Sequence, residues 1–200
     1  ADDLGLRQGR AVISPDVQQR IDSSRFHEIC DLCDCELRCS VLAVSYDQID
    51  VVVHPQSIVH SMVTFSDGAT MAQLSLPDMR LCMGYALAYP DRLDVPFGAI
   101  DWTDLSRLDF EAPDREAFPC LDLAFTAGRL GETAPAWLNA ANEVAVQAFL
   151  DGALSWVGIG ETLKKMLEAW PGDLADGVEA VLLADEQSRA ATQALIKREA

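Results

Sequence analysis

The sequence predicts an α+β fold, in which a β-hairpin and a helix are followed by a small C-terminal helical bundle. Two patterns predict it: strand-like runs around an Asp-Gly turn between residues 58 and 74, and amphipathic helical stripes from residue 133 onward. Hydrophobic residues make up 50% of the chain and charged residues 24%, as in ordinary globular proteins. With 200 residues, the chain can form one medium domain or two small ones.

Two strand-like runs predict the hairpin. Residues 58–65 form one strand and residues 69–74 the other, and Asp67-Gly68 supplies a two-residue turn with positive φ angles. This turn would pair Thr64 with Met71. One face of the hairpin then carries both polar and apolar side chains and the other mostly apolar ones, which predicts a half-buried sheet.

A further strand and a helix flank the hairpin. Residues 49–53 are rich in valine and favour a short buried strand. Residues 76–78 open a helix that Pro90 closes. The apolar positions at helical spacing within it are Leu81, Tyr85 and Ala88.

Residues 93–117 predict a connector, because they are rich in Pro, Asp and Gly and have no hydrophobic period. We expect it to cover a surface, since its large apolar side chains favour burial. These side chains are Leu93, Phe97, Ile100, Trp102 and Phe110.

Residues 118–200 predict a small antiparallel helical bundle. Thr133 is placed to cap a helix that Gly152 ends, and a second helix stops before Pro171-Gly172. A third helix is predicted to begin near Asp185.

The charge balance excludes several classes of function. Thirty-two acidic and fifteen basic residues give a formal net charge of −17, which repels nucleic acid and anionic membrane surfaces. No apolar run approaches the roughly 20 residues that a bilayer-spanning helix needs. The first residues lack the pattern of a secretory signal, so we expect a cytoplasmic location.

Several ordered motifs over residues 46–200 resemble the 1-deoxy-D-xylulose 5-phosphate reductoisomerase family. The most specific is HPQSIVHSMV at residues 54–63. The other motifs follow in the family's order and are LPDMR at 76–80, YALAYPDRL at 85–93, FPCL at 118–121 and LNAANEVAV at 138–146.

The resemblance implies an oxidoreductase and isomerase of non-mevalonate isoprenoid biosynthesis. Such an enzyme rearranges a small phosphorylated sugar, 1-deoxy-D-xylulose 5-phosphate, and reduces the intermediate with NADPH to 2-C-methyl-D-erythritol 4-phosphate. A divalent cation, Mg or Mn, chelates the substrate oxygens. The family is homodimeric and has a nucleotide domain, a central catalytic domain and a C-terminal helical domain.

By this resemblance, His54 lies near the active site as a catalytic candidate, and Pro77 and Met79 lie beside the nicotinamide of the cofactor. The structural alternatives are a histidine that fixes a bend at a strand end, and an ordinary helix start with a packing methionine. No metal ligand is assigned. We expect His60 to be structural and Arg80 to pair with Asp78.

Asn139, Asn142 and Glu143 interrupt an apolar helix. The resemblance places them in a polar patch near the active-site floor, whereas hydrogen bonding between helices explains them equally well. None is assigned to catalysis.

Residues 1–44 depart from the family and stay unassigned, whereas residues 45–92 resemble the end of the catalytic and dimerisation domain. Residues 1–44 contain neither a Gly-x-Gly-x-x-Gly turn nor the family's acidic metal-binding motif. We therefore expect the chain alone to bind neither NADPH nor the cation and to be inactive.

A cysteine-rich stretch lies in this unassigned segment and comprises Cys30, Cys33, Cys35 and Cys39, with His27 nearby. It has enough ligands for one zinc ion, but its spacing is not that of paired zinc knuckles. A shift of reading frame upstream of residue 45 is the other explanation.

Three functions therefore stay open. The first is the C-terminal portion of a reductoisomerase that needs a further N-terminal part. The second is a non-catalytic dimerisation or regulatory fragment. The third is a zinc-binding module joined to a helical bundle.

Overall fold

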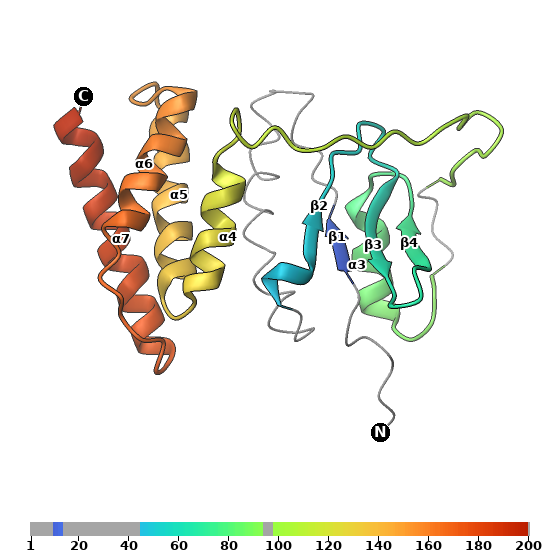
Figure 1. Ribbon diagram of the computed structural model, residues 1–200, viewed down its shortest axis with the longest axis horizontal. Helices are drawn as coiled ribbons and strands as arrows, with labels where there is room; N and C mark the ends of the chain where they lie inside the picture. Colours follow the sequence, from blue (N-terminus) through green and yellow to red (C-terminus); the bar gives the residue numbers. More distant parts are fainter. Residues whose placement is uncertain (1–9, 14–44, 94–97, 200) are drawn as a thin grey trace. The chain divides into compact units, whose positions relative to one another are not determined.

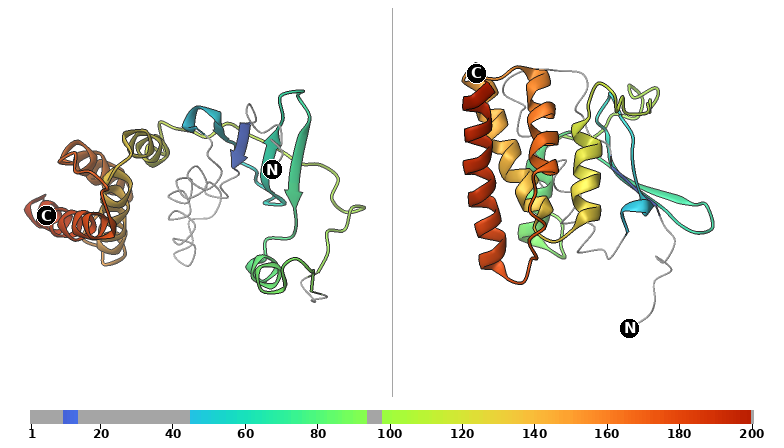
Figure 2. Two further views of the ribbon diagram at one scale, coloured as in Figure 1. Left: turned by 90° about the horizontal axis from the view of Figure 1, so that it is seen from below. Right: turned by 60° about the vertical axis from the view of Figure 1, so that its left-hand side comes forward.

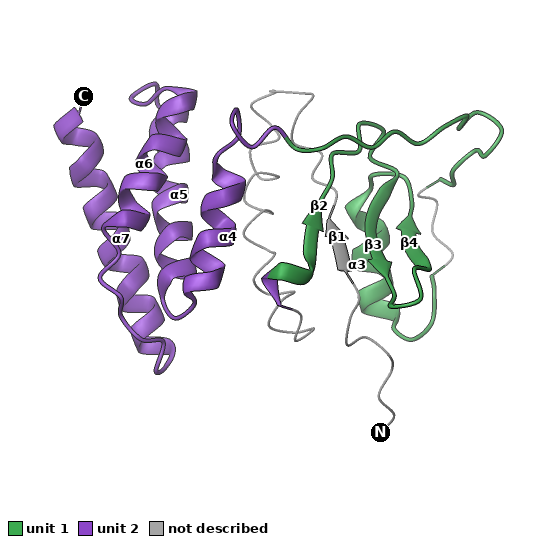
Figure 3. Cartoon of the chain, viewed as in Figure 1, with its two compact units in different colours: residues 1–21, 47–113 green, residues 22–46, 114–200 purple. Residues whose placement is uncertain are grey.

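The computed structural model describes the backbone of residues 10–13 and the whole of residues 45–93 and 98–199. The chain divides into two compact units (Figure 3). The first unit comprises residues 1–21 and 47–113, and the second comprises residues 22–46 and 114–200.

The first unit contains a four-stranded sheet with the strand order β2-β1-β3-β4 (Figure 1). Its strands are β1 (Arg10–Ile13), β2 (Ile49–Val51), β3 (Val59–Thr64) and β4 (Thr70–Leu74). β1 runs parallel to β2 and antiparallel to β3, and β3 pairs antiparallel with β4. The sequence pattern did not predict β1, because four residues are too few to show a period and its two partners lie far along the chain.

The hairpin between β3 and β4 has a three-residue loop instead of the predicted two-residue turn. The Gly68 N–H donates to the Phe65 carbonyl over 3.0 Å. Thr64 consequently pairs with Thr70, and the predicted pairing with Met71 is wrong. Gly68 has a φ of 88°, and no other residue of the loop has a positive φ. A type I turn followed by a left-handed glycine needs only one such residue, whereas the predicted turn needs two.

Helix α3 (Met79–Ala88) begins and ends where the sequence predicts. The Asp78 carboxylate caps its first turn by accepting a hydrogen bond from the Arg80 N–H over 3.0 Å. Gly84 is the helix's only buried residue, and the predicted inward position Tyr85 is exposed. The inner line of the helix is instead formed by Leu81, Gly84 and Ala88.

The connector exposes side chains that were expected to be buried. Trp102 is 65% exposed, and Leu93 and Phe110 are also exposed, whereas Ile100 is half-buried and Phe97 lies outside the described residues. The described part of the first unit offers little apolar surface to cover them. Its buried apolar residues are Ile49, Val51, Val53, Ile58 and Val59.

In its described residues the second unit is a four-helix bundle, and these helices run alongside one another in both views of Figure 2. They are α4 (Cys120–Leu130), α5 (Ala134–Leu150), α6 (Trp156–Glu168) and α7 (Val178–Glu199). α5 packs against the other three. The core is contiguous and includes Trp137, Leu138, Ala141, Ala145, Ile159, Leu163 and Met166. The predicted bundle is therefore confirmed.

Three details of the bundle differ from the prediction, and the first is that Thr133 makes no side-chain capping bond to α5. The sequence pattern did not single out α4, and α7 begins at Val178, two turns before the predicted start at Asp185. Asp185 lies within α7 and accepts a hydrogen bond from Arg189 over 2.7 Å, so its carboxylate pairs along the helix instead of capping it.

Among the described helices, none combines the length and the apolar character that crossing a bilayer requires.

Candidate functional site

His54 follows β2 and is completely buried, with an exposed fraction of 0%. Its Nδ1 lies 2.7 Å from the backbone carbonyl oxygen of Asp109. The imidazole stacks on the ring of Phe110, with centroids 4.7 Å apart and planes inclined by 19°. The other ring nitrogen, Nε2, is buried and has no hydrogen-bond partner among the described residues. Buried polar atoms are rarely left unpaired, so this nitrogen calls for an explanation.

Residues 109–111 of the connector hold His54 in place. Val53 and Glu111 form an isolated antiparallel bridge, in which each backbone N–H donates to the other's carbonyl over 2.9 Å. The Gln56 side chain binds Asp109 twice: its Nε2 donates to the carboxylate over 2.5 Å, and its Oε1 accepts from the backbone N–H over 3.1 Å. Five hydrogen bonds therefore join residues 53–56 to the connector, counting the one from His54.

The turn after His54 includes an unusual backbone conformation. The Ser57 N–H donates to the His54 carbonyl over 3.0 Å, and Ser57 has a φ of 51°. Residues other than glycine seldom adopt positive φ angles, and such residues concentrate at functional sites.

Pro77 and Met79 both lie on the exposed side of the segment that opens α3, and Met79 is 72% exposed. Leu76 and Asp78, which alternate with these two residues along the chain, are half-buried. They face a cavity of about 230 Å³ between the end of β4, the start of α3 and the connector. Its lining comprises Leu74, Ser75, Leu76, Asp78, Leu81, Gly98, Ala99, Ile100 and Trp102. The two cofactor candidates are thus free to meet a ligand on the side away from this cavity.

Arg80 pairs with Asp78, as expected. Its guanidinium donates to both carboxylate oxygens, with Nη2 to Oδ2 at 2.5 Å. The side-chain hydrogen bond from Arg80, and then the backbone one, lower the pKa of the Asp78 carboxyl below its ordinary value. The pair stabilises the first turn of α3.

The structure brings no metal site together from the described residues. His60 Nε2 lies 3.2 Å from the Ser75 carbonyl oxygen, which agrees with a structural role in the hairpin. No group of three potential metal ligands occurs among the described residues, so they do not suffice to hold a divalent cation. Cys30, Cys33, Cys35, Cys39 and His27 lie outside the described residues, and the zinc hypothesis is untested.

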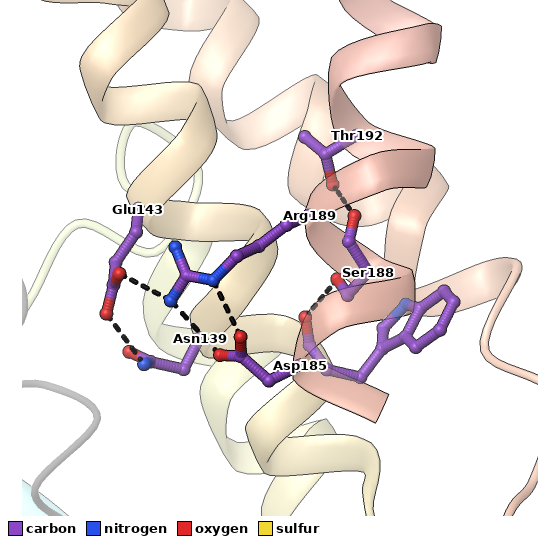
Figure 4. A network of polar contacts seen from close by, with 7 residues as sticks. Asn139, Glu143, Asp185, Ser188, Arg189 and Thr192 are labelled. Carbon is purple, nitrogen blue, oxygen red and sulfur yellow. Dashed lines mark hydrogen bonds and ion pairs between the residues drawn. The ribbon is translucent and has the colours of Figure 1, made fainter. Parts of the chain in front are cut away.

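Glu143 joins α5 to α7 by a hydrogen bond between helices, as the structural interpretation predicts for it (Figure 4). Asn139 donates to Glu143 over 3.2 Å, and Glu143 accepts from Arg189 of α7 over 2.6 Å. The hydrogen bonds from Arg189 to Asp185, and then to Glu143, raise the pKa of the guanidinium. Deeper between the helices, the Ser188 hydroxyl donates to the Trp137 carbonyl over 2.6 Å.

Sequence reasoning missed Asp109, whose carbonyl binds His54, and Gln56, whose side chain binds Asp109. The two residues are 53 positions apart, and Asp109 lies in a segment without a period. The only signal was the position of Gln56 within the motif of residues 54–63.

Comparisons with known proteins point to one family. The family described as "DXP reductoisomerase C-terminal domain" matches residues 74–191. The 1-deoxy-D-xylulose 5-phosphate reductoisomerase of Xanthomonas euvesicatoria is 53% identical over 147 residues, which cover 74% of this chain and 37% of that protein. The enzyme of Chloroherpeton thalassium is 50% identical over 146 residues, covering 73% and 38%. The chain thus spans less than two fifths of the length of these curated relatives.

Solved structures of reductoisomerases also match this chain. The reductoisomerase of Zymomonas mobilis in complex with NADPH matches with a TM-score of 0.81 and 32% identity, covering 94% of this chain and 55% of that one. A reductoisomerase in complex with NADPH, fosmidomycin and magnesium matches with a TM-score of 0.81 and 31% identity, covering the same shares.

Proposed function

Because this chain belongs to the 1-deoxy-D-xylulose 5-phosphate reductoisomerase family, we propose that it is the C-terminal portion of an enzyme with that activity. The enzyme rearranges 1-deoxy-D-xylulose 5-phosphate and reduces the intermediate with NADPH to 2-C-methyl-D-erythritol 4-phosphate. The observation that carries the proposal is the match of the family's C-terminal domain to residues 74–191.

The proposed cofactors are NADPH and a divalent cation, Mg or Mn. Solved relatives hold NADPH, magnesium and the inhibitor fosmidomycin. The exposed Pro77 and Met79 form the apolar edge that this chain offers to the nicotinamide. When bound, the cation orients the substrate and stabilises developing negative charge on its oxygens. The described residues contain no group of three potential ligands for it, so the proposed ligands lie outside them.

His54 is the proposed active-site residue of this chain. Its burial, its fixed orientation and its unpaired Nε2 support a role beyond fixing the strand end.

We also propose that the chain alone is inactive. The exposed apolar side chains of the first unit support this, because they lack the partners that a complete domain supplies. The most exposed of them are Met71, Met79, Met83, Leu87, Tyr89 and Trp102. The alternative function, a dimerisation or regulatory fragment, rests on the same exposed surface.

The proposed assembly is a homodimer formed through the sheet of the first unit. β4 is an edge strand, and four of its five residues are exposed. An exposed edge can pair with another strand. The acidic composition supports a cytoplasmic location away from nucleic acid and membrane surfaces.

The proposed domains are the end of the catalytic and dimerisation domain at residues 45–92, a connector at 93–117 and the C-terminal helical domain at 118–200. The compact bundle of α4 to α7 supports the last of these.

A hybrid enzyme tests the proposed function. In the Xanthomonas euvesicatoria relative, the 147 matched residues are replaced by those of this chain. We expect the hybrid to consume NADPH in the presence of substrate and a divalent cation, while this chain alone does not. A folded hybrid that binds NADPH without turnover would contradict the proposal, and turnover by the chain alone would contradict its inactivity.

A further inference from the structure

We infer that Gln56 and Asp109 are positioning residues that fix the imidazole of His54 as the Nδ1–H tautomer. The buried Nε2 then presents a lone pair to a hydrogen-bond donor, a hydroxyl or ammonium group, in the complete active site. The inference rests on the proposed function for the identity of that site, whereas the tautomer is a property of this chain.

The tautomer follows from the partner of Nδ1. A backbone carbonyl oxygen can only accept a hydrogen bond, and the Asp109 carbonyl lies 2.7 Å from Nδ1. Nδ1 must therefore carry the hydrogen, and Nε2 of the neutral ring is an acceptor.

The position of that carbonyl depends on its neighbours. The backbone bridge between Val53 and Glu111 sets the direction of the connector, and the two hydrogen bonds from Gln56 fix Asp109 itself. Phe110 covers one face of the imidazole at 4.7 Å. The ring is thus held at one edge by a hydrogen bond and at one face by stacking, while the Gln56 amide holds the carbonyl.

The unpaired Nε2 indicates the chemistry of the missing partner. The atom is buried and finds no hydrogen-bond partner within residues 45–93 and 98–199, and a buried acceptor without a donor is costly. A lone pair accepts from a hydroxyl or an ammonium group, whereas an ionised carboxylate has no hydrogen to give. A neutral His54 therefore cannot donate to a metal-binding carboxylate from Nε2. It accepts, either from a hydroxyl of the substrate or from a donor side chain of the enzyme.

The first test is nitrogen-15 NMR of the imidazoles in the full chain. Long-range proton–nitrogen correlations separate a protonated ring nitrogen from an unprotonated one, and the variant His54→Asn assigns the signals among the three histidines. We expect a protonated Nδ1 and an unprotonated Nε2 at His54. A protonated Nε2 in the neutral ring, or a doubly protonated ring at neutral pH, would overturn the inference.

A pair of variants tests the positioning role. Gln56→Ala removes both side-chain hydrogen bonds to Asp109, and we expect the two His54 nitrogen shifts to move toward a common value as the tautomers mix. Arg107→Gln is the matched control, because Arg107 also donates to the Asp109 carboxylate, over 3.0 Å, but its side chain is 78% exposed. It should leave the shifts unchanged. Unchanged shifts in a folded Gln56→Ala chain would show that Gln56 does not position the ring.

The hybrid enzyme identifies the source of the donor. A change of the Nε2 shift between the chain and the hybrid assigns the donor to the enzyme, and a change only on adding substrate assigns it to the substrate. A shift that stays the same in both comparisons excludes the acceptor role. If the tautomer is as expected but the hybrid is inactive, the proposed function fails alone, whereas an active hybrid with the other tautomer overturns only this inference.

Discussion

Ser57 is the residue at which the motif of residues 54–63 departs most from relaxed backbone geometry. Its φ of 51° lies in the left-handed region, and its N–H closes the turn onto the His54 carbonyl. Left-handed geometry costs an ordinary side chain roughly 1–2 kcal/mol, because Cβ approaches the carbonyl oxygen. The turn that orients His54 is thus maintained by the hydrogen bonds around it and not by the preference of residue 57.

Two substitutions at this position should behave differently. Ser57→Gly removes the steric cost but adds chain entropy to the unfolded state, worth about 0.4–1 kcal/mol, so we expect little change in stability. Ser57→Val should destabilise the first unit by more than about 1 kcal/mol, because a β-branched side chain tolerates positive φ poorly. Native-state hydrogen exchange of β3 amides measures both. Equal effects of the two variants would show that the turn relaxes.

Two helices of the bundle begin in different ways, although a hydroxyl residue precedes each. The Ser155 side chain caps α6 by accepting from the Gly158 N–H over 3.1 Å. Thr133 precedes α5 but makes no capping bond. Its buried hydroxyl donates to the Asp173 carbonyl over 2.8 Å and accepts from the Trp170 indole over 3.0 Å. Thr133 therefore fastens the segment after α6 to the start of α5.

Because Ser155 and Thr133 make different hydrogen bonds, replacing them should destabilise the bundle by different amounts. Ser155→Ala should lower the free energy of unfolding of the bundle by about 1 kcal/mol, the usual value for a lost cap. Thr133→Val should lower the free energy of unfolding by about 1–3 kcal/mol, because it leaves the Trp170 indole N–H without its acceptor and leaves the Asp173 carbonyl only the backbone N–H of residue 133, at 3.4 Å. Denaturant unfolding followed by tryptophan fluorescence measures both.

Matched controls keep the polar group in each case. Ser155→Asp retains an acceptor and Thr133→Ser retains the hydroxyl. Both variants should therefore have a free energy of unfolding close to that of the parent chain. A Thr133→Val variant as stable as Thr133→Ser would show that water replaces the lost hydroxyl.

The two units of the molecule differ in how much of their apolar surface is buried. The second has a contiguous core that draws on α4, α5 and α6. The first buries five apolar residues in its described part and exposes larger ones along α3 and the connector. Since burial of apolar surface is the main source of stability, the second unit should be the more stable in the isolated chain.

Limited proteolysis of the full chain tests this expectation. Cleavage should accumulate in the first unit, and a fragment that begins close to residue 114 and contains α4 to α7 should persist. Mass spectrometry identifies the fragment. Early cleavage within α5 or α6, with residues 47–113 intact, would show the opposite order of stability.

The sequence predicted the elements whose patterns are local. The spacing of apolar residues located α5 and α6, and Asp78 and Pro90 bounded α3. It did not predict β1, the register of the hairpin or the start of α7, because each depends on partners elsewhere in the chain or on one dihedral angle. At the candidate site the motif identified His54. The bonds to Asp109 join residues far apart, so no local pattern encodes them.

The exposed methionines of the first unit can oxidise, and their oxidation limits how long the isolated chain keeps apolar surface on that unit. Met71, Met79 and Met83 are all exposed, whereas Met166 is buried in the bundle. Exposed thioethers oxidise to sulfoxides, which are polar and no longer suit an apolar contact. A lone chain will therefore oxidise first at these methionines of the first unit, while Met166 stays protected within the bundle. Old preparations should lose apolar surface on the first unit even though their helical bundle remains folded.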